Sequence, residues 1–267
     1  FAEVLASTKV LRASSVPASR VVGNAWAAFL WLTADTGRAR LLLDAAAAEL
    51  GEVEPGSEAT RCEDFIRVVL SLVLLFDGEF EAALSEAEAG LATWDVLTEN
   101  ECRAADARAA LTGLLILDRP DEARSLASRA AFVRSPFGTM DFYVALCHIA
   151  LGECDTAEPL LRRLAARSAS GRVRLEAGSM LLLFAALAHA EGELETARRL
   201  LLTTVNRRTI DLLPYGKHLA GVLAIADEYA GLSAPLTFDE QLAHQRVCIE
   251  VLQAEIRRRG WDPVSTG

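Results

Sequence analysis

The stretch "GEFEAA" at residues 78–83 follows a long apolar run, and close variants return as "GECDTA" at 152–157 and "GELETA" at 192–197. Glycine is the residue best able to end a helix in the left-handed conformation, and acidic residues after it favour the start of a new helix. The final alanine is small enough to let two helices approach closely. Each hexamer therefore predicts the turn of a helical hairpin.

Two weaker variants, "ADTGRA" at 34–39 and "DRPDEA" at 118–123, fit the same pattern. The five closing alanines are separated by 44, 40, 34 and 40 residues; they are Ala39, Ala83, Ala123, Ala157 and Ala197. A period in this range is typical of a helical solenoid.

A second regularity lies 12 residues before each closing alanine, inside the expected first helix of each hairpin. The residues there are Ala27, Ser71, Leu111, Ala145 and Ala185, small in all units but the third. The residues directly before them are mostly large and apolar: Trp26, Leu70, Ala110, Val144 and Phe184. A large residue beside a small one suits close packing of two helices.

Composition supports helices and argues against several functions. Of the 267 residues, 52% are hydrophobic but only 6% aromatic, with 8 prolines, which favours helices over strands. A net charge of −10 argues against a nucleic-acid-binding surface. The five cysteines form no CxxC pair, so we expect reduced thiols in a cytoplasmic protein. No apolar run is long enough for a membrane span.

The large–small pair, the glycine turn and the alanine together resemble the tetratricopeptide repeat (TPR) over residues 20–210. The resemblance implies an all-α fold, a right-handed α-solenoid of about five TPR-like hairpins. Residues 218–260 predict a helix, a break at 231–235 and a long helix, and they are similar to the end of the helical repeats in MalT/LuxR-type bacterial signal-transduction ATPases. We expect one domain over 1–267, with a remnant of an earlier repeat at 1–16 and a C-terminal capping helix within 211–260.

Motifs of common enzymes are absent from the sequence. It contains no GxGxxG, no GxxxxGK[ST] and no HExxH. Its four histidines lie far apart, and paired carboxylates such as Glu79 and Glu81 stand at helix starts, where they suit the helix dipole. We therefore expect a protein that is not an enzyme, with no catalytic residues, no cofactor and no metal site.

The concave face of a solenoid is lined by the first helix of each hairpin, and this face is the expected binding surface. The repeat phase places seven candidate binding residues there: Asn24, Trp31, Phe65, Phe76, Arg108, Phe142 and His189. Two interpretations stay open. These side chains pack against one another inside a tightly curled solenoid, or they line an apolar groove for a partner helix or a hydrophobic ligand.

Arginines gather at 162–174 and again at 198–208. Two interpretations stay open. The arginines complement helix dipoles and keep the surface in contact with water, or they form a row that binds an acidic partner or nucleic acid. The first alternative agrees with our expectation that the chain does not bind nucleic acid directly.

From these observations we expect a non-catalytic sensor or interaction module of a bacterial transcriptional or signalling regulator. Its partner would be a protein segment or a small effector, with no membrane involved. The chain begins with Phe1 and not with Met, so it stays open whether it is a piece of a longer protein with an effector domain on the same polypeptide. The alternatives are a free-standing scaffold that assembles a complex and an enzyme-associated helical subunit. A homodimer also stays open.

Overall fold

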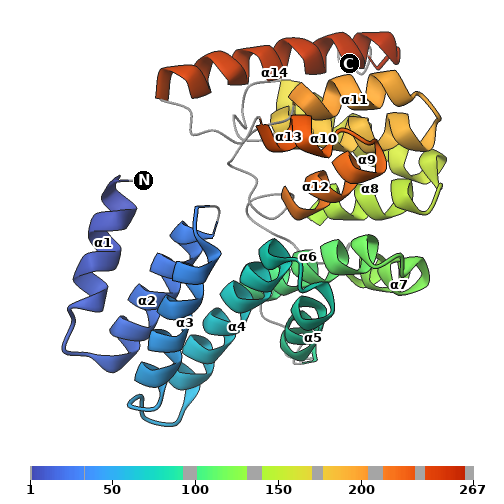
Figure 1. The fold of residues 1–267 in the computed structure, drawn as a ribbon. Coiled ribbons are helices and arrows are strands. Elements are labelled where there is room, and N and C mark those ends of the chain that lie inside the picture. Colours follow the sequence, from blue (N-terminus) through green and yellow to red (C-terminus); the bar gives the residue numbers. More distant parts are fainter. Residues whose placement is uncertain are drawn as a thin grey trace. The chain divides into compact units, whose positions relative to one another are not determined.

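The computed structural model describes residues 2–32, 34–92, 101–130, 140–169, 177–203, 213–231 and 238–261 (Figure 1). Every regular element in these ranges is a helix, which confirms the all-α prediction. The chain divides into two compact units, residues 1–117 and 118–267. That both units belong to one domain stays a prediction.

The first unit contains six of these helices, each packed against its neighbours in sequence. They are α1 (Ala2–Arg12), α2 (Pro17–Trp31), α3 (Thr36–Leu50), α4 (Ser57–Asp77), α5 (Phe80–Leu91) and α6 (Glu101–Ile116). In addition, α2 contacts α4 and α4 contacts α6, so alternate helices also touch. Pro17 opens α2 at a position where its missing N–H leaves no helical hydrogen bond unmade.

The second unit is built around α10, in which every residue from 177 to 188 is buried. Its helices are α7 (Pro120–Ala130), α8 (Met140–Ala150), α9 (Cys154–Ala169), α10 (Ala177–Ala190), α11 (Leu194–Thr203), α12 (Leu213–Val222), α13 (Ala226–Gly231) and α14 (Phe238–Arg258). The helices α8, α9, α11 and α14 all pack against α10.

The three hexamers form the same turn, as the sequence predicts. Gly78, Gly152 and Gly192 adopt left-handed φ values of 81°, 72° and 80°. The amide after each glycine donates to the carbonyl five residues before it, at 2.9, 2.8 and 2.8 Å. These bonds define the Schellman motif, which satisfies carbonyls that the helix end leaves without partners.

Two other turns adopt this geometry without glycine, at Asp118 (φ 54°) and Ala224 (φ 56°). At the second, the amide of Ile225 donates to the carbonyl of Ala220 at 2.9 Å, the same Schellman bond. We did not predict a turn there because residue 224 is not glycine. The "ADTGRA" turn differs, since Asp35 caps α3 by accepting from the amide of Arg38 at 2.9 Å.

The closing alanines lie where helices touch. All five of them, Ala39, Ala83, Ala123, Ala157 and Ala197, have no exposed surface. The five residues that stand 12 positions earlier are also buried, including Leu111 of the third unit. The spacing that we read from the sequence therefore marks the close contacts between helices.

An arginine directly after the closing alanine binds the next turn in three places. Arg40 pairs with Asp77 at 2.7 Å and with Glu79 at 2.5 Å, on both sides of Gly78. Arg124 pairs with Glu153, and the Nε of Arg198 donates to the carbonyl of Leu223 at 3.2 Å. Three of the five second helices are thereby joined to a following turn.

The turn at Gly192 is bound by α14 instead, because α9 carries Glu158 after its closing alanine. Arg259 donates two bonds to Glu191, at 3.0 and 2.8 Å, and Arg258 pairs with Glu193 at 2.8 Å. Both arginines also pair with Glu255, which is buried. Burial opposes the ionised form of Glu255, but hydrogen bonds from the two arginines outweigh it and lower the pKa of this carboxyl.

We expect Ala83→Leu to lower the free energy of unfolding by about 1–3 kcal/mol, because added methylenes overpack a fully buried contact. The neighbouring Ala82 is exposed, so Ala82→Leu should change it by less than about 0.5 kcal/mol. Urea unfolding followed by circular dichroism measures both. Equal stability of the two variants would contradict the buried contact.

The turns predict a pair of opposite effects. A residue with a Cβ is strained at positive φ, so Gly192→Ala should cost about 1 kcal/mol of stability. Ala224→Gly should relieve the same strain and raise the stability by about 0.5 kcal/mol. The gain is smaller than the strain because glycine loses more backbone entropy than alanine on folding. Thermal unfolding of both variants beside wild type tests the pair; a loss of stability in Ala224→Gly would refute it.

Candidate functional site

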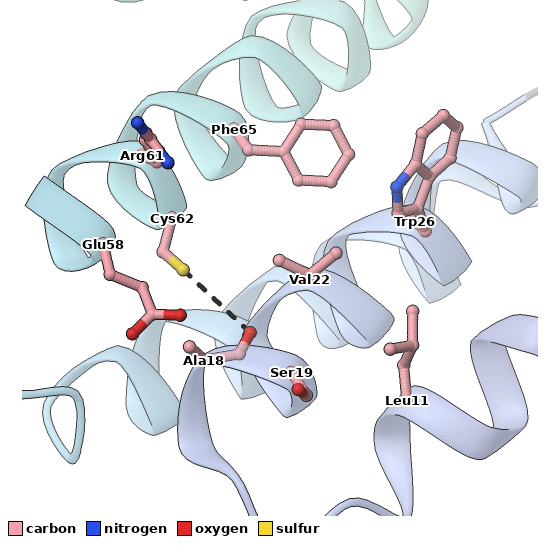
Figure 2. A pocket seen from close by; sticks show the side chains of 9 residues that line it. All are labelled: Leu11, Ala18, Ser19, Val22, Trp26, Glu58, Arg61, Cys62 and Phe65. Atoms are coloured by element: carbon pink, nitrogen blue, oxygen red, sulfur yellow. Dashed lines mark hydrogen bonds between the residues drawn. The ribbon is translucent and has the colours of Figure 1, made fainter.

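A groove in the first unit is the clearest candidate site (Figure 2). It has a volume of about 400 Å³. It is lined by one residue of α1, four of α2 and four of α4: Leu11; Ala18, Ser19, Val22 and Trp26; Glu58, Arg61, Cys62 and Phe65. Apolar side chains form most of this surface, and the polar groups lie toward one end of it.

One wall of the groove depends on a close approach of α1 to α2. A Cβ added to Gly23 would lie 2.8 Å from the Cβ of Leu11 and 2.8 Å from the backbone nitrogen of Arg12. Only glycine allows this contact without a shift of one helix. Beside it, the Nε of Arg12 donates to the Oδ1 of Asn24 at 2.8 Å. These contacts hold Leu11 at the groove.

Two aromatic side chains meet at the apolar end. The ring centroids of Trp26 and Phe65 lie 5.3 Å apart, and Phe29 contacts Trp26 edge-on at 5.6 Å. Trp26 nevertheless stays 39% exposed. Removing apolar surface from water is favourable, so a ligand that covers the exposed part of the Trp26 ring gains binding free energy.

The floor of the groove belongs to the hydrophobic core. Ala18 and Cys62 are part of a buried cluster with Val21 and Ala46, and the Sγ of Cys62 lies 4.0 Å from the carbonyl oxygen of Ala18. Burial, followed by the charge of Glu58, raises the pKa of the Cys62 thiol. A protonated thiol is a poor nucleophile, so this cysteine contributes apolar surface to the floor.

Among the predicted binding residues, only Phe65 lines this groove. Asn24 is buried and bonded to Arg12, and it does not line the groove. Trp31 is half-buried under the guanidinium of Arg38, whose Cζ lies 3.9 Å from the ring centroid. Phe76 is half-buried near the end of α4. The structure therefore does not bring these first-unit residues together.

The second-unit candidates lie inside packed helices. Phe142 is 2% exposed, and His189 is half-buried near the end of α10. Leu182 of α10 is buried, and a Cβ added to Gly216 of α12 would lie 3.9 Å from its Cδ1. Around these residues, side chains pack against one another inside the unit.

Eight of the nine groove residues were not predicted as binding residues, and Trp26 is the aromatic one among them. We interpreted Trp26 as the large residue of the large–small pair that packs between two helices, and this interpretation implies that Trp26 is buried. A usable signal was the row of Ala18, Val22 and Trp26 at four-residue intervals, which marks one face of α2. The row alone does not show whether another helix covers it.

In the described part of the arginine-rich segments, Arg162 and Arg198 contact other groups of the fold, whereas Arg172, Arg174, Arg207 and Arg208 lie outside the described residues. Arg162 pairs with Glu158 at 2.5 Å and stands over the ring of Trp261. Arg198 pairs with Glu195 at 2.9 Å in addition to its bond to the α12–α13 turn. A second hollow, of about 660 Å³, lies between α11 and α13, and it is lined by charges of both signs.

Two cysteines of the second unit are buried and hold their protons, while Cys154 is half-buried. Burial raises the pKa of Cys147 to about 12 and that of Cys248 to about 11. Among the described residues, no three His, Cys, Asp or Glu side chains are grouped as metal ligands. Within the same ranges, no helix has both the length and the apolar character needed to cross a membrane.

An unusual carboxyl group lies between α5 and α6, next to the predicted residue Arg108. A Cβ added to Gly90 would collide with Asp106, so the carboxyl occupies the space that this glycine leaves. Asp106 is 3% exposed. Burial raises its pKa to about 8, although the charges of Arg67 and Arg108 oppose the shift. The charge of the half-buried Arg108 therefore lowers the pKa of the buried Asp106, and Arg108 does not line the groove.

No protein-family model, no curated protein and no solved structure matches this chain. The site therefore has to be interpreted from its own geometry.

Asp106 predicts a pH dependence of stability. Unfolded, the carboxyl loses its proton near pH 4, whereas folded it keeps the proton to about pH 8. Between these values the unfolded state binds fewer protons, so stability should fall as pH rises through this window. Asp106→Asn stays neutral and should be more stable than wild type by about 3 kcal/mol at pH 8, with a small difference at pH 4.

Urea unfolding at several pH values measures this effect. The exposed Asp44→Asn serves as the control and should follow the wild-type profile. If Asp106→Asn also follows that profile, the carboxyl is not the source of the pH dependence.

Proposed function

We propose that the chain is a non-catalytic helical-repeat module that binds an apolar segment of a partner protein. Its architecture would be a right-handed solenoid of TPR-like hairpins closed by α14. Five left-handed turns at helix ends, the buried closing alanines and the three arginines that bind a following turn support this assignment. Such repeats build extended surfaces suited to peptide recognition.

The exposed Trp26 beside Phe65 is the observation that carries the proposal. Tryptophan is enriched among the residues that dominate binding energy at protein interfaces, especially where apolar neighbours surround it. Here the neighbours are Val22, Leu11 and Phe65, and the polar groups lie at one end, where they can fix the orientation of a bound segment.

Binding in this groove needs none of the usual catalytic groups. Its titratable side chains are Glu58, Arg61 and Cys62, and the thiol is buried and held in its protonated form. Shape and apolar area therefore decide what the groove holds, and the two exposed charges add selectivity.

In a regulator of the MalT/LuxR type, binding of the partner to this module would change the activity of an effector domain. The coupling requires that the partner bind one arrangement of the helices better than another. The contact at Gly23 is suited to this role, because any shift of α1 against α2 changes the wall of the groove.

Selection from a phage-displayed library of random peptides tests the binding role. We expect peptides that bind wild type and lose at least tenfold in affinity, about 1.4 kcal/mol, when Trp26→Ser and Phe65→Ser are combined. Leu41→Ser removes another apolar side chain, 70% exposed on α3, and should leave binding unchanged. A selection in which every peptide binds the groove variant as well as wild type would refute the proposal.

A further inference from the structure

Asp106 of α6 is a buried acid that the proposed binding role does not use. The residue is 3% exposed, and its Oδ1 has no hydrogen-bond partner among the described residues. Its Oδ2 lies where a side chain of Gly90 would begin, since a Cβ added to Gly90 would stand 2.1 Å from this oxygen and 2.7 Å from the Cγ of Asp106. The carboxyl group is therefore held directly against the backbone of α5.

The surroundings of this carboxyl favour its neutral form. Burial raises the pKa of Asp106 to about 8; the charges of Arg67 and Arg108 act against this shift, and those of Asp64 and Glu86 add to it. Arg67 already pairs with Asp64 at 3.2 Å, and its Nε lies 4.0 Å from Glu86. One guanidinium shared in this way offers little compensation to a further carboxylate. An ionised Asp106 would thus keep a buried, charged oxygen without a donor, which is costly.

The end of α5 is the part of this contact that opens most easily. Gly90 is the last residue but one of the helix, and it has no side chain to expose. In the same turn, Glu88 and Ala89 are exposed and Leu91 is half-buried. On the other side of the contact, α6 is buried throughout residues 104–107. Helix ends with little buried apolar surface open locally at a lower free energy than packed interiors.

We propose that the contact between Asp106 and Gly90 is a proton-dependent switch within the first unit. With the proton in place, the last turn of α5 packs on α6. When the proton passes to solvent, residues 88–91 unwind and water reaches the carboxylate. The helices α4 and α6 and the earlier turns of α5 keep their places.

The direction of the pH effect follows from the protons that each state binds. In the open state the carboxyl is hydrated and loses its proton near pH 4, whereas in the closed state it keeps the proton to about pH 8. The open state therefore binds fewer protons between these values. The ratio of open to closed molecules rises with pH in this window, by up to about tenfold per pH unit, and stays constant above it.

Hydrogen–deuterium exchange of the full chain, followed by mass spectrometry, tests the switch. The observable is the protection factor of amides 88–91, the intrinsic exchange rate at a given pH divided by the measured rate. This ratio removes the pH dependence of the exchange chemistry itself. We expect protection in wild type to fall at least tenfold from pH 6 to pH 8 and to stay constant within about twofold in Asp106→Asn. The exposed Asp44→Asn is the control and should behave as wild type.

A second pair of variants tests the geometry without a change of pH. The added methyl group of Gly90→Ala collides with the carboxyl, so protection of amides 88–91 at pH 6 should be at least tenfold lower than in wild type. Asp106→Ala in the same chain makes room for this methyl group, so the double variant should recover protection to within about threefold of wild type. Melting temperatures show whether the variants fold; if Gly90→Ala does not, Asp106→Asn still decides the outcome.

Four results would overturn the inference. Equal pH dependence in wild type and Asp106→Asn would assign the opening to another titrating group. Constant protection of amides 88–91 in wild type would mean that the carboxyl does not open the turn. Unchanged protection in Gly90→Ala would show that the carboxyl does not lie against α5. Simultaneous loss of protection throughout α4, α5 and α6 would show that ionisation unfolds the whole unit; the predicted effect of Asp106 on stability would then stand without the switch.

Discussion

The left-handed backbone at the end of four of the five first helices is the constraint on which the remaining structure depends. A positive φ reverses the chain within two residues, and the Schellman bonds satisfy the last carbonyls of the helix. The second helix then starts at a fixed place, and the closing alanine in its first turns is buried in all five cases. Complete burial of all five alanines follows from this geometry, even though one of the five turns is made differently.

Ionic contacts then join one hairpin to the next. Arg40 and Arg124 bind acidic groups at the following turn, and Arg198 reaches a turn carbonyl in place of a carboxylate. Partly exposed pairs of this kind contribute little stability individually, because water and salt screen them. They do fix register, since the two partners are held by different hairpins. At the Gly192 turn, α14 supplies the arginines, and this contact draws the C-terminal end of the chain onto α10.

The groove and the buried face of α10 show two states of one kind of surface. Where α14 covers Phe184, aromatic packing and ion pairs complete the core. Where no element of the described chain covers Trp26, an aromatic pair stays accessible above an apolar floor. Fixed helices hold this floor, so a ligand finds a preformed surface and little ordering entropy is lost on binding. The approach of α1 at Gly23 is the most sensitive part of this arrangement.

Local patterns in the sequence determined the helices, the hairpin turns and the buried alanines, because caps and helical periodicity act over a few residues. Of the seven residues that they marked as candidates for binding, Phe65 lines the groove. They did not show the turn at Ala224, where packing holds a residue with a Cβ at positive φ. Nor did they separate Trp26 from Phe184, which share one signature and differ completely in burial. Only the tertiary structure decided this, because burial depends on whether a segment distant in sequence packs over the side chain.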